Sequence, residues 1–256
     1  MNCLKLKIKV MEENEAFERV SGVEKLSMID MRGYASCVLF SNGCSGYKCP
    51  YCYNVSLWKN ELPEYEAEGI KRYLLSRQGL IDYVVFSGGE CTIWPKYLKD
   101  SARWCKNNGF RVKVDTNGSN PYLIMEMYED GLLDYVALDY KYPISKENAY
   151  RRFHDSENLK WHLQELLSWL IEREKKFETR TTIHPDITNE SDANLILDEL
   201  SEAGYKGTHF FQFFNESPET LGKVNQHPRR FKIEELKIPD GMKVEYRNLK
   251  NNERRH

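Results

Sequence analysis

The 256-residue sequence contains neither a long apolar run nor a strong excess of charge of either sign. No stretch approaches the roughly 18 apolar residues that a membrane span requires, and 37 basic against 39 acidic residues give a net charge of −2. A membrane protein is therefore disfavoured, as is a nucleic-acid-binding protein that depends on a basic surface. With 41% hydrophobic residues the chain can still bury a sizeable core. We expect a soluble, cytoplasmic protein.

The sequence also lacks the cysteine pattern of a disulfide framework. Of seven cysteines, Cys44, Cys49 and Cys52 lie close together and the others stand alone. In a reducing compartment thiolates remain available to bind iron or zinc, so this distribution indicates a metal site. No second cluster follows Cys105, which excludes an auxiliary iron–sulfur domain.

Apolar strand-like segments alternate with segments of helical spacing along most of the chain. The expected strands are 36–41, 83–87, 111–115, 135–139, 179–183 and 208–214. The expected helices are 67–76, 96–107, 121–129, 158–175 and 192–203. This alternation predicts an α/β fold with helices outside a parallel sheet. Six units favour a partial (β/α)6 TIM-like barrel over a doubly wound sheet.

The periodicity fades after residue 222. Residues 223–256 include ten basic and five acidic residues. Such a segment is more often a solvated terminus than a segment that docks a partner. We therefore divide the chain into one domain over residues 1–222 and a basic C-terminal tail over 223–256.

The cysteine cluster follows the first expected strand directly. Active sites of parallel barrels lie at the C-terminal ends of strands, where this loop is expected. Three thiolates from one loop can bind three irons of a [4Fe-4S] cluster and leave the fourth iron open for a substrate ligand. A zinc site would ordinarily take a fourth protein ligand. The spacing arises by chance too often to decide alone, so the other strand ends matter.

Polar motifs end the next three expected strands. Residues 88–90 are Gly-Gly-Glu, where the glycines allow a ligand to approach and the carboxylate can accept hydrogen bonds from an amine. Residues 115–118 are Asp-Thr-Asn-Gly, and residues 139–141 are Asp-Tyr-Lys. Each motif alone would be an ordinary turn. Together with the cysteines they indicate one ligand site at the rim of the barrel.

These motifs resemble those of radical S-adenosylmethionine (SAM) enzymes, and among them the activating proteins of anaerobic (class III) ribonucleotide reductases. The resemblance covers residues 22–216 and is densest at VLFSNGC, CPYCYN, FSGGE, VDTNG, LLDYVALDYK and RTTIHPDIT. It implies a radical SAM fold, a [4Fe-4S] cluster and SAM as cofactors, and a flavodoxin- or ferredoxin-type reductant. It also implies that a 5'-deoxyadenosyl radical takes a hydrogen atom from a backbone glycine of a partner reductase.

The resemblance assigns roles position by position. The cluster ligands would be Cys44, Cys49 and Cys52. The SAM-binding residues would be Tyr51 beside adenine, Gly88, Gly89 and Glu90 at the methionine amine, and Asp115, Thr116, Asn117, Asp139, Lys141 and Arg180 near the ribose and carboxylate.

Three positions depart from the family pattern. Four residues instead of three separate Cys44 from Cys49, an enlargement that the backbone freedom of Gly46 could absorb. Cys91 replaces the usual proline, and we interpret it as a small buried residue instead of a ligand. Tyr53 replaces the histidine of related activases.

Two other functions compete with the activase hypothesis. A small-molecule radical SAM enzyme, such as 7-carboxy-7-deazaguanine synthase, resembles this chain in its short barrel. That group usually carries Asp-Thr after its last cysteine, where this chain has Tyr53-Asn54. A zinc-stapled binding module would leave the polar strand ends unexplained.

Overall fold

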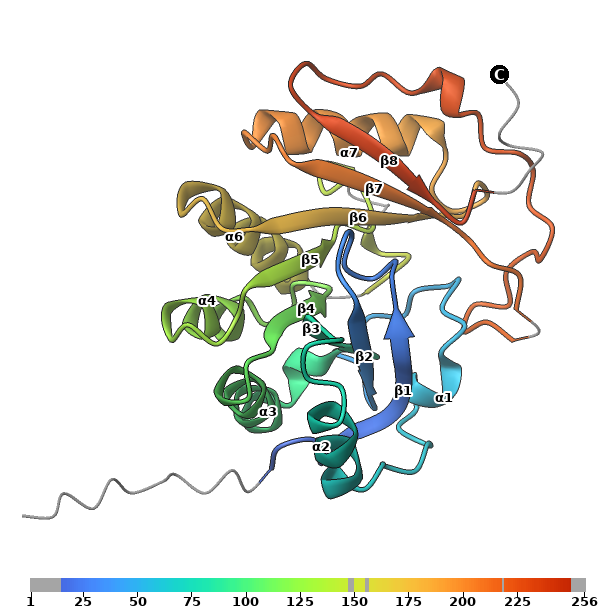
Figure 1. The fold of residues 1–256 in the computed structure, drawn as a ribbon. Coiled ribbons are helices and arrows are strands. Elements are labelled where there is room, and N and C mark those ends of the chain that lie inside the picture. Colours follow the sequence, from blue (N-terminus) through green and yellow to red (C-terminus); the bar gives the residue numbers. More distant parts are fainter. Residues whose placement is uncertain (1–14, 147–149, 155–156, 218, 250–256) are drawn as a thin grey trace, which may run out of the picture.

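Eight strands in chain order, β1 to β8, form one sheet that curves into an incomplete barrel (Figure 1). The computed structural model describes residues 15–146, 150–154, 157–217 and 219–249. The strands are β1 (Val20–Ser27), β2 (Ser36–Ser41), β3 (Tyr83–Gly88), β4 (Arg111–Thr116), β5 (Tyr135–Asp139), β6 (Phe177–Ile183), β7 (Thr208–Phe213) and β8 (Lys243–Arg247). Only β1 and β2 pair antiparallel, and every later neighbouring pair is parallel.

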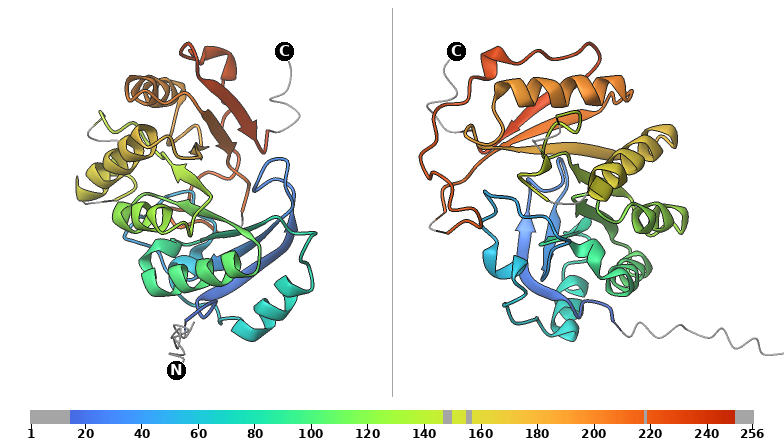
Figure 2. Two further views of the ribbon diagram at one scale, coloured as in Figure 1. Left: turned by 60° about the vertical axis from the view of Figure 1, so that its left-hand side comes forward. Right: turned by 180° about the vertical axis from the view of Figure 1, so that it is seen from behind.

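Helices cover the outer face of the parallel strands (Figure 2). They are α2 (Ala67–Leu75), α3 (Pro95–Asn107), α4 (Pro121–Glu129), α6 (Glu157–Glu172) and α7 (Glu190–Glu202). The short helix α1 (Val55–Trp58) lies apart from them in the connection after β2, and the 3-10 turns are η1 (Cys91–Ile93) and η2 (Ile233–Glu235). Helix α6 buries Leu163, Leu166 and Leu170 completely, as its apolar stripe predicts. No helix in the described part of the chain is long and apolar enough to cross a membrane.

The predicted α/β fold and partial barrel are confirmed. Each of the six expected strands occurs, as β2 to β7, and each of the five expected helices occurs with its ends shifted by at most a few residues. Cys91 is fully buried in the core, in agreement with its interpretation as a small buried residue. The strands β1 and β8 and the short helix α1 were not predicted.

The basic segment after residue 222 packs against the domain as far as the structure describes it. Phe231 is fully buried, and the Arg229 guanidinium forms an ion pair with Glu190 at 2.6 Å. Strand β8 extends the sheet, with Arg247 opposite Gln212 of β7. These contacts correct the expectation of a solvated terminus for residues 223–249. Residues 1–14 and 250–256, which the two predicted regions include, lie outside the described residues.

The β1–β2 hairpin connects the two open edges of the barrel. Arg32 of its loop forms an ion pair with Glu245 of β8, and the Lys113 ammonium of β4 donates to the main-chain oxygen of Asp30. Because Lys113 is fully buried, the hairpin loop satisfies a charged group inside the barrel. The hairpin loop therefore contacts strands on both sides of the barrel, β4 and β8.

Candidate active site

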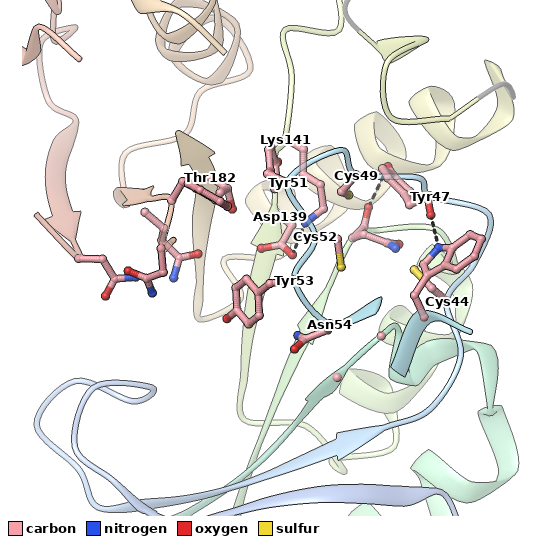
Figure 3. A pocket seen from close by; sticks show the side chains of 18 of the residues that line it. Cys44, Tyr47, Cys49, Tyr51, Cys52, Tyr53, Asn54, Asp139, Lys141 and Thr182 are labelled. Atoms are coloured by element: carbon pink, nitrogen blue, oxygen red, sulfur yellow. Dashed lines mark hydrogen bonds and ion pairs between the residues drawn. The ribbon is translucent and has the colours of Figure 1, made fainter. Parts of the chain in front are cut away.

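The three clustered cysteines line one cavity at the C-terminal end of β2 (Figure 3). Main-chain hydrogen bonds hold their loop from both sides. The N–H of Lys48 donates to the oxygen of Phe153 at 2.5 Å, and the N–H groups of Leu221 and Gly222 donate to Cys52 and Pro50 at 2.9 and 2.8 Å. The loop conformation is thus fixed by segments distant in sequence.

Tyr47 shows how the loop accommodates its extra residue. Gly46 adopts a φ of +72°, which places the Tyr47 ring inside the protein with 1% exposure. The Tyr47 hydroxyl donates to the main-chain oxygen of Asn117 at 3.3 Å, and its own main-chain oxygen accepts from the Trp58 indole at 2.7 Å. The enlarged loop is therefore anchored on the end of β4 and on α1.

The three thiols must lose their protons before they can bind a metal. Burial raises the pKa of Cys44 and Cys52, and raises that of Cys49 to about 11, so binding iron must displace protons. Among the described residues, no three histidine, cysteine or carboxylate side chains converge to hold one ion. Thiolates of a cubic cluster bind separate irons and need not converge, whereas structural zinc requires four close ligands.

The Gly88-Gly89-Glu90 turn is seated directly on the start of the cysteine loop. The N–H of Gly89 donates to the main-chain oxygen of Ser41 at 3.0 Å, and the N–H of Glu90 donates to the main-chain oxygen of Gly43 at 2.8 Å. A Cβ on Gly89 would lie 1.8 Å from the Gly43 oxygen, so only glycine fits there. Gly88 and Gly89 both line the cavity.

The Glu90 carboxylate faces the protein beneath this turn. It accepts hydrogen bonds from the hydroxyls of Thr92 and Thr116 at 2.7 and 2.8 Å, and from the N–H of Asn117 at 2.7 Å. Burial raises its pKa, and these hydrogen bonds oppose that effect. From the sequence we expected this carboxylate to accept hydrogen bonds from the amine of the ligand. In the structure its oxygens already accept hydrogen bonds from groups of the protein, and Gly88 and Gly89 are the residues of the turn that line the cavity.

A chain of ion pairs connects the ends of β4 and β5 with the middle of β6. Arg180 contacts Asp115 at 3.0 Å and Asp139 at 2.9 Å, and Asp139 in turn contacts Lys141 at 2.8 Å. Burial alone would raise the pKa of both aspartates, but the neighbouring cations outweigh burial and lower it. Asp139 and Lys141 reach the cavity wall, and Arg180 and Asp115 support them from behind.

Comparisons with known proteins identify this arrangement. The family model for the radical SAM superfamily matches residues 38–198. The chain belongs to the radical SAM superfamily. Radical SAM enzymes use a [4Fe-4S] cluster and SAM, so the zinc-module hypothesis is rejected.

The chain is similar to two further proteins in sequence and to a third in fold. A Methanocaldococcus jannaschii protein named "Putative glycyl-radical enzyme activating enzyme" is 31% identical over 221 residues, covering 85% of this chain and 89% of the relative. The pyruvate formate-lyase-activating enzyme of Clostridium pasteurianum is 33% identical over 131 residues, covering 48% and 52%. The fold resembles anSMEcpe with bound AdoMet and a peptide, with a TM-score of 0.51 and 18% identity over 73% of this chain and 52% of that chain.

The cavity of this radical SAM enzyme brings together most of the predicted site residues. Those on its wall are Cys44, Cys49, Cys52, Tyr51, Gly88, Gly89, Asn117, Asp139 and Lys141. Four others lie behind the wall, namely Glu90, Asp115, Thr116 and Arg180. The wall also contains residues that the sequence did not point to: Tyr47, Trp58, Thr182, Gln212, Phe213, Phe214, Asn215 and Asn248. Gln212 and Phe213 lay on an expected strand, but nothing in the sequence connected Asn248 with the site.

Proposed function

We propose that this radical SAM enzyme installs a glycyl radical on an anaerobic (class III) ribonucleotide reductase. The observation that carries the proposal is the 31% identity across 89% of a relative named for activating a glycyl-radical enzyme. The 33% identity to a pyruvate formate-lyase-activating enzyme agrees with the same type of reaction. The choice of a ribonucleotide reductase rests on the resemblance of the motifs between residues 22 and 216.

Cys44, Cys49 and Cys52 would hold the cluster at the cavity wall. The bound cluster would supply one electron, received from a flavodoxin- or ferredoxin-type protein, for the cleavage of SAM to methionine and a 5'-deoxyadenosyl radical. The chain's own part is to bind and orient. The buried rings of Tyr47 and Phe213 on the cavity wall keep water from the reacting atoms.

The remaining wall residues divide SAM recognition between them. The main chain of Gly88 and Gly89 would face the methionine amine, and the Lys141 ammonium, held by Asp139, would attract the carboxylate. Tyr51 lies on the wall beside the expected adenine position. A hydrogen atom then moves from the glycine Cα of the partner to the 5' carbon, which gives 5'-deoxyadenosine and a glycyl radical.

The test is to incubate reconstituted enzyme with SAM, dithionite and a cognate class III reductase. Electron paramagnetic resonance should show a doublet that survives removal of the activase, because the radical resides on the reductase. A reductase in which alanine replaces the radical glycine should give no doublet. SAM cleavage that requires a small purine-like substrate and no protein partner would contradict the proposal and favour the small-molecule alternative.

A further inference from the structure

Four side-chain amides at the mouth of the cavity have no hydrogen-bond partner among the residues that the structure describes. They belong to Asn54, Gln212, Asn215 and Asn248. Within the residues that the structure describes, none of these amides takes part in a hydrogen bond, and Asn54 does not cap the helix α1 that follows it. Asn215 and Asn248 are exposed, so they form the outer part of the mouth. Polar groups placed at a site but left unpaired are available to a ligand.

The fold brings these amides to the mouth from two separate parts of the chain. Gln212 lies near the end of β7, and Asn215 follows two residues after that strand ends. Asn248 follows β8 directly and comes beside them because Arg247 pairs with Gln212. Asn54 comes from the cysteine loop, next to the half-exposed Tyr53 (Figure 3). Amides therefore border the mouth on the loop side and on the sheet side.

The chemistry of the mouth suits a neutral ligand that both donates and accepts hydrogen bonds. Among the described residues on the wall, Lys141 is the one basic residue, and we have assigned it to the carboxylate of SAM. No further basic side chain of the wall is therefore left to bind an anionic group of a second ligand. A carboxamide presents an N–H donor and a C=O acceptor, as a peptide bond does. The ligand that matches several such groups in a row is the main chain of a peptide.

We propose that Asn54, Gln212, Asn215 and Asn248 bind the main chain of the partner segment that carries the glycine. The inference rests on the proposed function and specifies how that partner is held. Recognition through the main chain suits glycine in particular, since glycine offers no side chain to grip. It also places the Cα, and not a flanking side chain, nearest to the cavity.

The test removes single amides from the outer mouth and measures binding of the reductase. The variants are Asn215→Ala, Asn248→Gly and the double variant, with Asn107→Ala at the exposed end of α3 as a matched control. Glycine is chosen at position 248 because the residue has a φ of +59°, which alanine would strain. The dissociation constant for full-length reductase is measured anaerobically by calorimetry with reconstituted enzyme and SAM.

Loss of one neutral hydrogen bond should raise the dissociation constant about three- to tenfold for each single variant, and about ten- to hundredfold for the double variant. Asn107→Ala should leave it unchanged. With synthetic peptides that span the radical glycine, N-methylation of the flanking amides should weaken binding more than replacement of the flanking side chains by alanine.

Three outcomes would overturn the inference. If the wild type and the double variant bind the reductase equally well and still form the radical, the proposed role of the amides is refuted, but the proposed function is not. If the variants raise only the dissociation constant for SAM and not that for the reductase, the amides bind SAM and not the partner. Absence of both reductase binding and a glycyl radical with wild-type enzyme would refute the proposed function itself, and the inference with it.

Discussion

Glu90 offers the sharpest test of whether the turns after β3 and β4 act as one unit. Its carboxylate joins the hydroxyls of Thr92 and Thr116 to the main-chain N–H of Asn117, at distances between 2.7 and 2.8 Å. Glu90→Gln keeps the shape of the side chain but replaces one acceptor oxygen with an NH2 group. If that NH2 takes the position facing Asn117, two donors meet and the N–H of Asn117 loses its partner.

The magnitude follows from the burial of these groups. Glu90 is 2% exposed. A buried donor left without a partner costs about 1–3 kcal/mol, and a hydrogen bond to a charged acceptor contributes about 1.5–3 kcal/mol. We therefore expect Glu90→Gln to lower the free energy of unfolding by about 2 kcal/mol. Glu90→Ala should lower it further because every donor loses its acceptor. SAM affinity should fall as well, since Asn117 lies on the cavity wall.

The measurement is chemical denaturation under anaerobic conditions, together with SAM titration of the reconstituted enzyme. Glu129→Gln is the control, because Glu129 lies exposed at the end of α4. In a double-mutant cycle, Glu90→Gln and Thr116→Val should be non-additive, since the two side chains share a hydrogen bond. Wild-type stability and wild-type SAM affinity in Glu90→Gln would refute the linking role of the carboxylate.

Three further predictions concern the cluster, the turn and a buried histidine. Cys49→Ser should abolish the cluster absorbance and iron binding, whereas Cys105→Ser, in the core away from the cavity, should retain both; full iron content in Cys49→Ser would refute the assignment. Gly89→Ala should impair SAM binding because its Cβ would collide with the Gly43 oxygen at 1.8 Å, and wild-type affinity would show that the turn is not seated as described. Burial lowers the pKa of His209 to about 3, below its unfolded value, so its contribution to stability is present above about pH 6.5 and is lost as the pH falls. Between pH 7 and 5 the wild type should therefore lose about 2 kcal/mol more stability than His209→Asn, and equal losses in urea denaturation would contradict this.

Strands β2 to β7 could be predicted because most of them are short apolar runs that end in a polar turn. β3 illustrates this, with Val84, Val85 and Phe86 fully buried between the helices and the barrel interior. β1 and β8 carry no such signal. The middle of β1 contains exposed Glu24 and Lys25. The partly exposed β8 depends on pairing with β7, from which 29 residues of the sequence separate it. Their existence follows from long-range pairing, which local patterns do not encode.

The site was predictable to the extent that its residues lie within strand-end motifs. Gly88 and Lys141 follow expected strands and do reach the cavity. The direction of a side chain was not predictable in the same way, and the Glu90 carboxylate lies beneath the turn because Asn117 of a different strand end binds it. Asn248 reaches the site only through the unpredicted strand β8. Tertiary pairing is therefore the reason why sequence reasoning missed Asn248.

The central claim, that this enzyme abstracts a hydrogen atom from a backbone glycine of a protein partner, is tested most directly by isotope transfer. Class III reductase labelled with deuterium at its glycine α positions is incubated with reconstituted enzyme, SAM and dithionite. The account predicts that the doublet resonance collapses to a single line and that one deuterium appears in 5'-deoxyadenosine. Unlabelled 5'-deoxyadenosine formed alongside an unchanged doublet, or label recovered only from a small substrate with no reductase present, would contradict it.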